Sequence, residues 1–512
     1  MAARADTPGS RLMQLPLFLL LIGAASVAML VPAVYAGVIR ELPTARAFLY
    51  SGLLGLIAFG LIALTLSNRP MRRDTLGPLV ALFSAFTVLP AMLAIPFYEA
   101  LGTTTFYNAY VEMVSAMTTT GAPVFDDPRR LNDALHLWRA LVGWLGGLLM
   151  WVSAAAILAP LNLGGFEVTA RAEPGRRQSF DVTMALPDAR FRLARAARLL
   201  VPAYAGLTLL VWILLLVSGD VSLVALSHAM SIMATSGISP VGGVQNGQSS
   251  IPGEAVMLLF MLFALSRLTF STDTMTSDSG GLRSDPEFRI GVGIALVVPM
   301  LLFLRHWYGA FDVGQEDSWA EAVQALWGGL FTTLSFLTTT GFQSIAWGAA
   351  QSWSGLQTPG LLLMGLALIG GGVATTAGGV KLLRVYALYK HGLRETEQLV
   401  HPSSVSGAGG LGRRLQRQGA FIAWIFFMLF ALSIAVVTLA LTALGVDFET
   451  AIVLTIAGLS TTGPLIEVAA SEPIRLIELS AGAKAVFTAA MVIGRLETLA
   501  IVALLTPDLW RR

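Results

Sequence analysis

The stretch Met117-Thr118-Thr119-Thr120-Gly121-Ala122 ends a short apolar segment, and closely related stretches occur three more times along the chain. The other copies are Met233-Ala234-Thr235-Ser236-Gly237-Ile238, Leu337-Thr338-Thr339-Thr340-Gly341-Phe342 and Leu459-Ser460-Thr461-Thr462-Gly463-Pro464. A single copy would be explained by threonine hydroxyls that bond to their own helix and by a glycine that allows close packing. Four copies, each between two long apolar runs, instead indicate a repeated unit with a shared function.

The repeated loop has the composition of a cation-binding backbone. Irregular backbone at membrane depth persists only where it lines water or is buried in protein. Glycine supplies a positive φ angle that turns successive carbonyls toward one axis, and threonine adds a hydroxyl oxygen. Four such loops can replace the hydration shell of a cation, and the negative C-terminal ends of the preceding half-helices favour a cation there. The predicted ion ligands are Thr119, Thr120, Gly121, Thr235, Ser236, Gly237, Thr339, Thr340, Gly341, Thr461, Thr462 and Gly463.

The composition indicates a membrane protein and excludes several other classes. Of 512 residues, 55% are hydrophobic and 12% are charged, whereas a soluble domain carries about 25% charged residues. The net charge of +2 gives no sign of a nucleic-acid partner. Cysteine is absent and the five histidines are scattered, so disulfides, thiolate metal sites and an intramembrane metalloenzyme are not expected. Without a nucleophile elbow, a phosphate-binding loop or paired catalytic carboxylates, we expect no enzyme activity and no bound cofactor.

Apolar runs long enough to cross about 30 Å of hydrocarbon predict about ten membrane-spanning helices. They begin near Leu12, Ala47, Leu76, Ala134, Leu193, Pro252, Phe288, Leu356, Ala420 and Leu479. The first run is longer than the apolar core of a signal peptide, so we interpret it as a membrane helix. Four shorter apolar segments precede the repeated loops and have the length of re-entrant half-helices: residues 106–117, 221–234, 319–337 and 448–459.

These segments predict an all-α polytopic membrane protein. Four pseudo-symmetric repeats, each consisting of a helix, a pore helix with its loop, and a second helix, are expected to surround a central pore. Residues 1–75 would form two extra N-terminal helices. The repeats would comprise residues 76–165, 166–275, 276–392 and 393–512, and cytoplasmic loops open the second and the fourth.

Basic residues predict the orientation, because lysine and arginine are enriched in cytoplasmic loops. One side of the predicted membrane domain carries Arg69, Arg72, Arg73, Arg171, Arg176, Arg177, Arg190, Arg192, Arg195, Lys390, Arg394, Arg413, Arg414, Arg417, Arg511 and Arg512. On the other side are the re-entrant segments, the outnumbered pair Arg40 and Arg46, and the acidic residues Asp126, Asp127, Asp312, Glu316 and Asp317. We therefore expect both termini in the cytoplasm and a mildly acidic outer surface.

A glycine-rich stretch, Gly370-Gly371-Gly372-Val373-Ala374-Thr375-Thr376-Ala377-Gly378-Gly379-Val380-Lys381, interrupts the eighth apolar run. Each glycine costs up to about 1 kcal/mol relative to alanine in a helix, so an ordinary helix is unfavourable here. Close packing of small residues is one interpretation, and an unwound stretch that lines the pore is the one we favour. The residues of this stretch that would line the pore are Gly371, Gly372, Thr375, Thr376, Gly378, Gly379 and Lys381.

Arg495 lies in the last apolar run, with Glu497 close by. A charge inside the membrane costs at least about 2.5–3.5 kcal/mol unless it is paired or faces water. Residues two apart lie on different helix faces, so we expect that these two side chains do not pair with each other. Arg495 then either forms an ion pair with a neighbouring helix or places a positive charge in the pore. Glu112 and Glu449, within the half-helices, are expected to cap or tether those helices.

Together these features resemble the Trk/Ktr/HKT family of potassium transporters, and in particular its Trk-type pore-forming membrane subunits, which also have two extra N-terminal helices. The resemblance runs from about Leu76 to the C-terminus and rests on the four loops, the glycine-rich stretch and Gly494-Arg495-Leu496-Glu497. It implies that the loops form a selectivity filter. The same resemblance implies that the glycine-rich stretch is an intramembrane gate loop, with the gate residues Gly371, Gly372, Thr375, Thr376, Gly378, Gly379 and Lys381. It also implies that Arg495 lies below the filter and affects gating.

The family resemblance also bears on the ion and on the partners. Glycine in every loop goes with potassium preference, whereas a serine in the first loop goes with sodium transport in some plant members. This chain departs from the pattern at Ser236 and at Pro464. The resemblance implies a homodimer in the lipid of a bacterial inner membrane, bound to a ring of nucleotide-binding (NAD- or ATP-type) regulatory subunits by basic segments such as 171–177 and 413–417. A sodium-conducting relative and an unrelated secondary transporter, which would show inverted repeats, remain alternatives.

Overall fold

Helices form all the regular secondary structure in the described part of the computed structural model, which comprises residues 15–66, 77–161, 163–166, 189–266, 285–309, 319–356, 358–401, 419–497 and 501. Within these ranges, seven helices are long and apolar enough to cross a membrane: Leu17–Val38, Leu42–Leu66, Gly77–Leu101, Asp133–Leu161, Phe191–Val217, Pro286–Arg305 and Ala420–Ala443. Large apolar side chains such as Leu54 and Leu64 are exposed on them, as expected of surfaces that face lipid. The predicted all-α multi-pass membrane fold is therefore confirmed.

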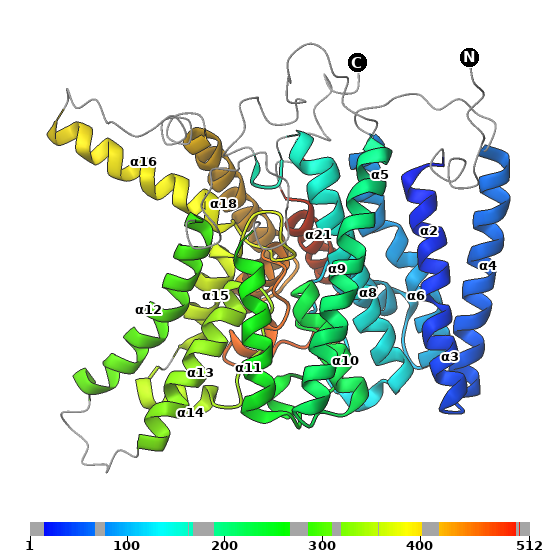
Figure 1. The fold of residues 1–512 in the computed structure, drawn as a ribbon, viewed down its shortest axis with the longest axis horizontal. Helices are drawn as coiled ribbons and strands as arrows, with labels where there is room; N and C mark the ends of the chain where they lie inside the picture. The colour runs from blue at the N-terminus through cyan, green and yellow to red at the C-terminus, as the bar shows by residue number, and fades with distance from the viewer. Residues whose placement is uncertain are drawn as a thin grey trace.

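The N-terminal helices pack against each other at one edge of the molecule (Figure 1). Helices α2 (Leu17–Ala28) and α3 (Leu30–Val38) follow one another, and α4 (Leu42–Leu66) returns beside them. A methyl group added at Gly55 of α4 would overlap the hydroxyl of Ser26 on α2. Small residues therefore allow these helices the close approach that is typical of membrane helix pairs.

Four short helices precede the four repeated loops, and they cover the predicted half-helices to within one residue. They are α7 (Phe106–Met117), α10 (Ser222–Ala234), α13 (Trp319–Leu337) and α19 (Phe448–Leu459). Capping side chains fix two of their starts: the Thr105 hydroxyl accepts a hydrogen bond from the Asn108 amide, and the Asp447 carboxylate accepts one from the Thr450 amide. Each helix ends where its threonine-containing loop begins, so its negative end is aimed at that loop.

Further helices precede and follow each of these pore helices. The helices before them are α5 and α6 (Gly77–Thr87 and Leu89–Leu101), α9 (Ala189–Val217), α12 (Pro286–Gly309) and α18 (Ala420–Ala443). The helices after them are α8 (Asp133–Ser153), α11 (Ser250–Met261), α15 (Pro359–Ile369) and α21 (Ala481–Leu496). Helices α11, α15 and α21 are shorter than the seven spanning helices of the described chain, so the count of ten crossings remains a prediction.

Glycines bring the pore helices against their neighbours. A methyl group at Gly146 of α8 would overlap the carbonyl of Met117 at the end of α7, and one at Gly147 would meet Ala234 at the end of α10. At Gly494 of α21 it would overlap the carbonyl of Leu459 at the end of α19. The ends of these three pore helices are therefore fixed by backbone contact rather than by long side chains.

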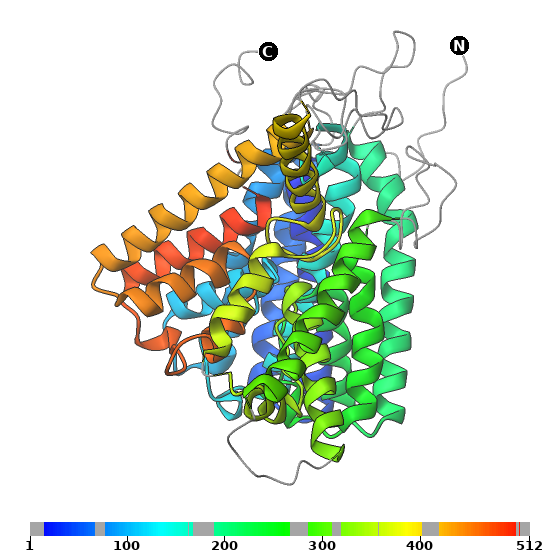
Figure 2. The same ribbon diagram turned by 90° about the vertical axis from the view of Figure 1, so that its left-hand side faces the viewer.

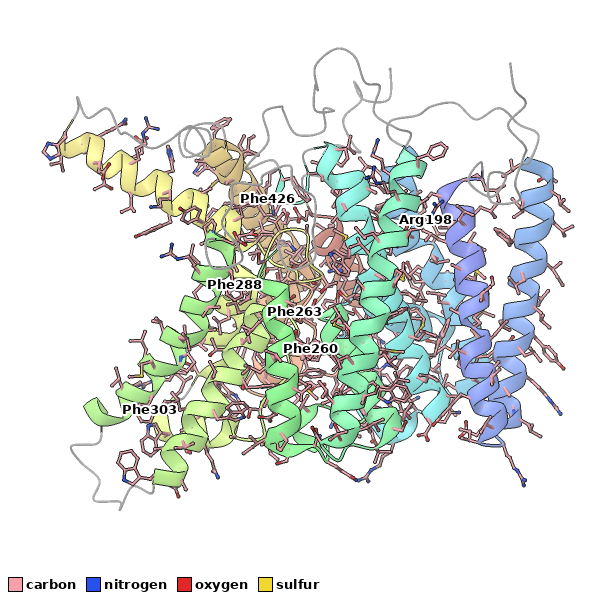
Figure 3. The ribbon with its side chains drawn as sticks, in the orientation of Figure 1. Arg198, Phe260, Phe263, Phe288, Phe303 and Phe426 are labelled. Carbon is pink, nitrogen blue, oxygen red and sulfur yellow. The ribbon has the colours of Figure 1, made fainter. Side chains whose placement is uncertain are left out.

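Two peripheral features complete the fold. Helix α16 (Leu382–Val400) leaves the body of the molecule at one side, as Figures 1 and 2 show, and the predicted boundary at residue 392 falls inside it. On the same side of the molecule, but at the opposite end of α12 from α16, Phe303 of α12 stacks on Trp353 of α14 (Trp347–Ser354) with ring centroids 5.5 Å apart (Figure 3). Helix α16 itself is buried only in its first turns, as at Leu382 and Leu383, and its far end projects.

Candidate functional site

The same unusual backbone conformation occurs in all four repeated loops. Thr119, Thr235, Thr339 and Thr461, here called the loop threonines, have φ angles of 55°, 50°, 58° and 55°. A β-branched residue rarely adopts a left-handed conformation, which costs of order 1–3 kcal/mol per residue. From the sequence, positive φ angles were expected at the glycines alone, and these threonines were missed. Their recurrence two residues before each glycine places the strain at the candidate site.

The four glycines of these loops, here called the loop glycines, meet around one centre. A methyl group added at Gly121 would overlap the carbonyl oxygen of Ser236 in the second loop, and one at Gly237 would overlap that of Thr340 in the third. From Gly341 it would meet Pro464 of the fourth loop at 2.8 Å. From Gly463 it would lie 2.5 Å from the carbonyl oxygen of Thr120, back in the first loop. The loops therefore contact one another in chain order around a closed ring.

The fourth loop corrects one expectation from the sequence. Gly121, Gly237 and Gly341 have positive φ angles of 71°, 66° and 83°, whereas Gly463 does not. Its amide instead donates a 2.6 Å hydrogen bond to the carbonyl oxygen of Thr120. A glycine is thus needed at position 463 because the first loop approaches it closely, and not because of its φ angle. The short helix α20 (Leu465–Val468), which begins immediately after Pro464, sets the local backbone.

Hydrogen bonds between two hydroxyl groups of the same loop stiffen three of the loops. Hydrogen bonds connect the hydroxyls of Thr118 and Thr120 (2.8 Å), of Thr338 and Thr340 (3.1 Å), and of Ser460 and Thr462 (3.1 Å). The second loop has Ala234 at the first of these positions, and Ser236 donates to the hydroxyl of Ser231 at 3.2 Å instead. The departure at Ser236 is therefore compensated within the same pore helix.

Side chains nine residues before the loop glycines hold the chain that leaves three of the loops. The Glu112 carboxylate accepts a hydrogen bond from the Val124 amide at 2.7 Å and pairs with Arg139 at 2.5 Å. In the third repeat the Thr332 hydroxyl accepts one from the Ser344 amide at 3.2 Å. In the second repeat, His228 and the Ser239 hydroxyl are hydrogen-bonded at 2.9 Å.

Two more carboxylates tether loop exits. Glu449 accepts hydrogen bonds from the Ser471 amide and hydroxyl at 2.7 and 2.8 Å, so the tethering role predicted for Glu112 and Glu449 is confirmed. Glu254 of α11 is buried and accepts from the Ser344 hydroxyl at 2.7 Å and from the Ile345 amide at 2.6 Å. Sequence reasoning missed Glu254, although a lone carboxylate in an apolar helix was a signal for it.

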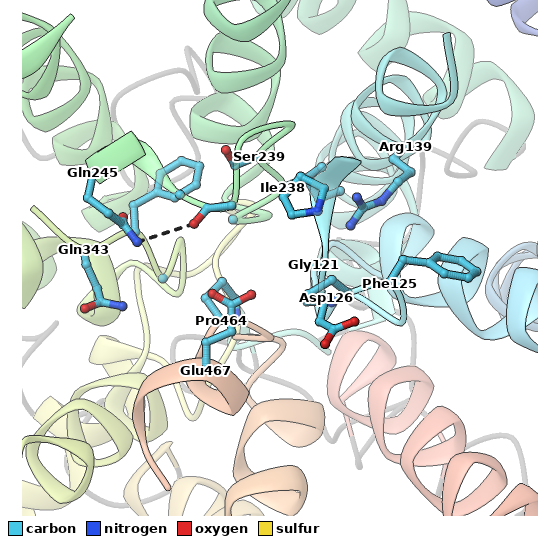
Figure 4. A pocket seen from close by; sticks show the side chains of 17 residues that line it. Gly121, Phe125, Asp126, Arg139, Ile238, Ser239, Gln245, Gln343, Pro464 and Glu467 are labelled. Atoms are coloured by element: carbon cyan, nitrogen blue, oxygen red, sulfur yellow. Dashed lines mark hydrogen bonds between the residues drawn. The ribbon is translucent and has the colours of Figure 1, made fainter. Parts of the chain in front are cut away.

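A cavity lies directly over the loops and is lined by Gly121, Gly237, Gly341 and Pro464 (Figure 4). Two carboxylates, Asp126 and Glu467, also line it, together with Arg139, whose charge is paired with Glu112. Glu467 is exposed at this cavity. The protein around its carboxylate still removes part of the hydration and raises the pKa of Glu467 to about 7; the charge of Arg139 opposes this rise, and that of Asp126 adds to it. The mouth therefore becomes more negative, and more attractive to a cation, as Glu467 ionises.

The glycine-rich loop, residues 370–381, lies against the other end of the repeated loops. Helix α15 ends at Ile369, and Gly370 and Gly379 turn the chain with φ angles of 73° and 77° before α16 begins. The amide of Gly378 donates a 2.7 Å hydrogen bond to the hydroxyl of Thr339. The Thr376 hydroxyl donates to the carbonyl of Met233 at the end of α10, at 3.2 Å. The unwound stretch predicted from the glycines is therefore present beside the loops.

Neighbouring elements fix the glycine-rich loop in this position. The amides of Gly372 and Val373 donate to the carbonyl of Ala264 and to the carboxylate of Glu287, at 2.9 and 3.1 Å. Arg495 donates to the carbonyl of Thr376 at 2.6 Å, and the ammonium of Lys381 donates to the carbonyl of Ala377. The Nε and Nη2 atoms of Arg495 are buried without a hydrogen-bond partner among the described residues.

As expected, Glu497 does not pair with Arg495 but with a residue far away in the sequence. The guanidinium of Arg384, in the first turn of α16, pairs with Glu497 at 2.5 Å and lies 3.6 Å from the ring centre of Phe426 on α18. The alternative of an ion pair with a neighbouring helix thus applies to Glu497, whereas Arg495 binds the glycine-rich loop. Arg384 was missed because its partner is more than a hundred residues away in the sequence.

Comparisons with known proteins fit this geometry. The model of the TrkH family, described as cation transport protein, matches residues 294–509. The chain is 30% identical over 435 residues to the Trk system potassium uptake protein TrkH of Salmonella typhimurium, and 31% identical over 443 residues to that of Vibrio parahaemolyticus; both matches cover 85% of each chain. The fold matches the crystal structure of the potassium transporter TrkH from Vibrio parahaemolyticus with a TM-score of 0.77 and 26% identity, over 99% of this chain and 100% of that one.

Proposed function

Because the chain belongs to the TrkH family of cation transport proteins, we propose that it carries potassium ions into the cell through the four repeated loops. The observation that carries this proposal is the closed ring in which each loop glycine meets the next loop. Backbone carbonyls and threonine hydroxyls at such a ring can replace the water around an ion. The acidic mouth above the ring and the negative ends of four pore helices add attraction for a cation.

Glycine in all four loops supports potassium over sodium as the main transported ion. The loop glycines lie where a side chain would overlap or crowd a neighbouring loop. Because glycine has no side chain, the carbonyls of the ring are not displaced. A sodium-conducting member of the same fold is the second candidate. An unrelated secondary transporter would have inverted repeats, which does not fit four loops in contact in chain order.

The glycine-rich loop is proposed as the gate of this pathway. It bonds to Thr339 and Met233 directly beneath the ring, so it obstructs the exit while it stays in place. Arg495 holds this loop and brings a positive charge close to it. A cation 4 Å from a like charge is disfavoured by about 4 kcal/mol even at an effective dielectric constant of 20, which lowers occupancy by about a thousandfold.

The proposed setting is a bacterial inner membrane, with both termini in the cytoplasm. We propose a homodimer that works with a separate ring of nucleotide-binding regulatory subunits, as expected for a membrane subunit of a Trk system. The basic segments proposed to dock this ring, 171–177 and 413–417, lie outside the described residues. No cofactor of the chain itself is proposed, and potassium is its substrate.

Counter-flux of labelled rubidium in proteoliposomes tests the transport proposal. Purified protein should admit rubidium against a potassium gradient, and external potassium should inhibit this uptake much more strongly than external sodium does. Empty liposomes provide the background. Equal inhibition by sodium and potassium would favour the sodium-conducting alternative, and rubidium entry no faster than in empty liposomes, even with the glycine-rich loop shortened, would contradict a pore through these loops.

A further inference from the structure

The hydroxyls of the four loop threonines have unequal surroundings. Those of Thr119 and Thr461 are buried and have no hydrogen-bond partner among the described residues. The hydroxyl of Thr235 donates to the carbonyl of Ala234 at 2.8 Å. The hydroxyl of Thr339 accepts the 2.7 Å hydrogen bond from the Gly378 amide. Each loop thus offers a threonine hydroxyl oxygen that can coordinate a cation. In the third loop, this oxygen is already bonded to the proposed gate.

The contact extends to the fourth loop. A methyl group added at Gly378 would overlap the carbonyl oxygen of Ser460 and the hydroxyl of Thr461. Gly378 therefore lies against oxygen atoms of two adjacent loops at once, and its N–H points at one of them. An N–H group presents positive charge to the oxygen that it approaches, so it disfavours a cation bound to that same oxygen.

We propose that the closed glycine-rich loop and the ion at the inner end of the ring compete for the same oxygens, chiefly the Thr339 hydroxyl, so that a bound potassium ion promotes opening. This inference rests on the proposed function. Binding that favours one of two conformations shifts the population toward it, and the coupling is reciprocal, so an open loop must also strengthen ion binding at Thr339. Potassium outside the cell would then help to open its own path.

The hydrogen bond sets the size of the expected effect. A neutral hydrogen bond contributes a modest net free energy, which corresponds to a change of about twofold to tenfold in the closed-to-open ratio. If the Gly378–Thr339 bond were merely structural, its loss would loosen the loop equally at every potassium concentration. Under competition, the loss of this bond and the binding of potassium both favour the open loop through the same oxygen. Potassium should therefore have little further effect once the bond is lost.

The absence of cysteine from the chain allows a direct measurement of loop opening. Ala377→Cys places one thiol in the glycine-rich loop at a position that is buried in the closed loop. Its rate of modification by a water-soluble thiol reagent, in the otherwise unaltered full-length protein, reports opening. We expect the rate to rise about twofold to tenfold when N-methylglucamine is replaced by potassium, and to rise less with sodium.

Substitutions of the loop threonines separate competition from a structural role. In the Ala377→Cys background, Thr339→Val should label rapidly without potassium and lose its response to potassium. Thr339→Ser, which retains the hydroxyl, should restore slow labelling and the response. Thr65→Val is the control outside the ring, because it removes an exposed hydroxyl that donates to the carbonyl of Ile62 in its own helix α4, so labelling without potassium should stay slow.

Two results would overturn the inference. One is a labelling rate that does not change with potassium when the loop threonines are intact. The other is equal acceleration by Thr65→Val and Thr339→Val. Rubidium flux measured on the same preparations distinguishes the two levels of the proposal: absence of flux contradicts the transport function, whereas potassium-independent labelling in a conducting protein contradicts the coupling alone.

Discussion

At the scale of single residues, the site depends on backbone shape more than on side-chain chemistry. Four threonines accept a left-handed conformation that costs stability, and four glycines sit where a side chain would overlap or crowd a neighbouring loop. Such strain persists because pore-helix ends, hydroxyl pairs and buried carboxylates hold each loop from outside. The consequence is that the smallest substitutions at the ring should alter ion preference.

Gly121→Ser is expected to reduce the preference for potassium and to increase sodium entry. The new side chain would meet the carbonyl of Ser236, which must move out of the ring. We expect a decrease of about tenfold or more in the potassium-to-sodium flux ratio, the size of effect that a 1.4 kcal/mol change in relative binding produces. Gly206→Ser is a matched control, because a methyl group there meets no other atom within 4 Å. An unchanged ratio in Gly121→Ser protein of normal stability would show that this loop does not line the path.

Glu467→Gln is expected to remove a pH-dependent step in uptake. With a pKa of about 7, Glu467 is about one tenth ionised at pH 6 and about nine tenths ionised at pH 8. The charge at the mouth, and uptake at low potassium, should therefore rise with pH in the unaltered protein. The variant should show a flat profile over this range and a KM raised about twofold to fivefold at pH 8, with little change in kcat.

The other carboxylate of the mouth gives the control for this pH effect. Asp126→Asn should keep the rise in uptake but shift it to slightly lower pH, because the charge of Asp126 contributes to the raised pKa of Glu467. The effect of Glu467→Gln should also shrink at high ionic strength, because an exposed charge is screened. A pH step of the same size in Glu467→Gln and in the unaltered protein would contradict the assignment.

At the scale of elements, the glycine-rich loop is a break between two helices that are held by different neighbours. Helix α15 begins against the end of α20, where Gly360 approaches the backbone of Ala469, and α16 is tied to α18 and α21 by Arg384. Between them the chain has positive φ angles at Gly370, Ala374, Gly379 and Lys381. A segment with so little helical preference can change shape while both helices stay folded. Gating should therefore be separable from ion selection.

Arg495→Ala and deletion of part of 371–378 should each raise basal flux without altering ion preference. The first change removes a positive charge and the bond to Thr376, and the second shortens the obstruction itself. We expect basal flux to increase at least about tenfold, which is less than the effect that the repulsion of a cation by an unscreened charge could have on occupancy. Arg198→Ala is a control of equal charge change on the exposed surface of α9 (Figure 3). If both variants keep the flux of the unaltered protein while folded, the barrier lies elsewhere.

Arg384→Met is expected to destabilise the protein by about 3–5 kcal/mol, because it leaves the buried Glu497 carboxylate without its cation. Thermal unfolding in detergent, followed by tryptophan fluorescence, measures the loss as a lowered Tm. Arg475→Met is the control, since the ion pair that Arg475 forms with Glu478 is exposed and contributes about 0–1 kcal/mol. Equal Tm shifts for the two variants would mean that the buried pair does not hold α16 to α21.

At the scale of the whole molecule, the sequence predicts the elements well and their contacts poorly. The pore helices are identified within one residue because their apolar length and the loop that follows are local signals. The partners of Glu254 and Arg384 are not predictable, since they join segments about 90 and 113 residues apart. The left-handed threonines escaped prediction because local preference opposes that conformation, and only packing by the other loops imposes it.

The shape of the molecule also suggests how a partner could control the gate. Helix α16 begins directly after Lys381 and projects from the body, so force on its far end would reach the glycine-rich loop (Figure 1). We expect a bound regulatory ring to change ion flux by acting on this helix. We also expect a dimer in detergent or nanodiscs. Light scattering gives the mass of the assembly, and rubidium flux with and without the ring gives its effect.

Changing Arg413, Arg414 and Arg417 together to Gln should weaken binding of the ring, and the loss should be largest at low salt, where charge attraction is least screened. The matched control is Arg40→Gln with Arg46→Gln, because those arginines lie on the side predicted to face outward. Ring binding measured by co-purification should survive the control change. A strictly monomeric protein with full flux and no response to the ring would contradict both the dimer and this mode of regulation.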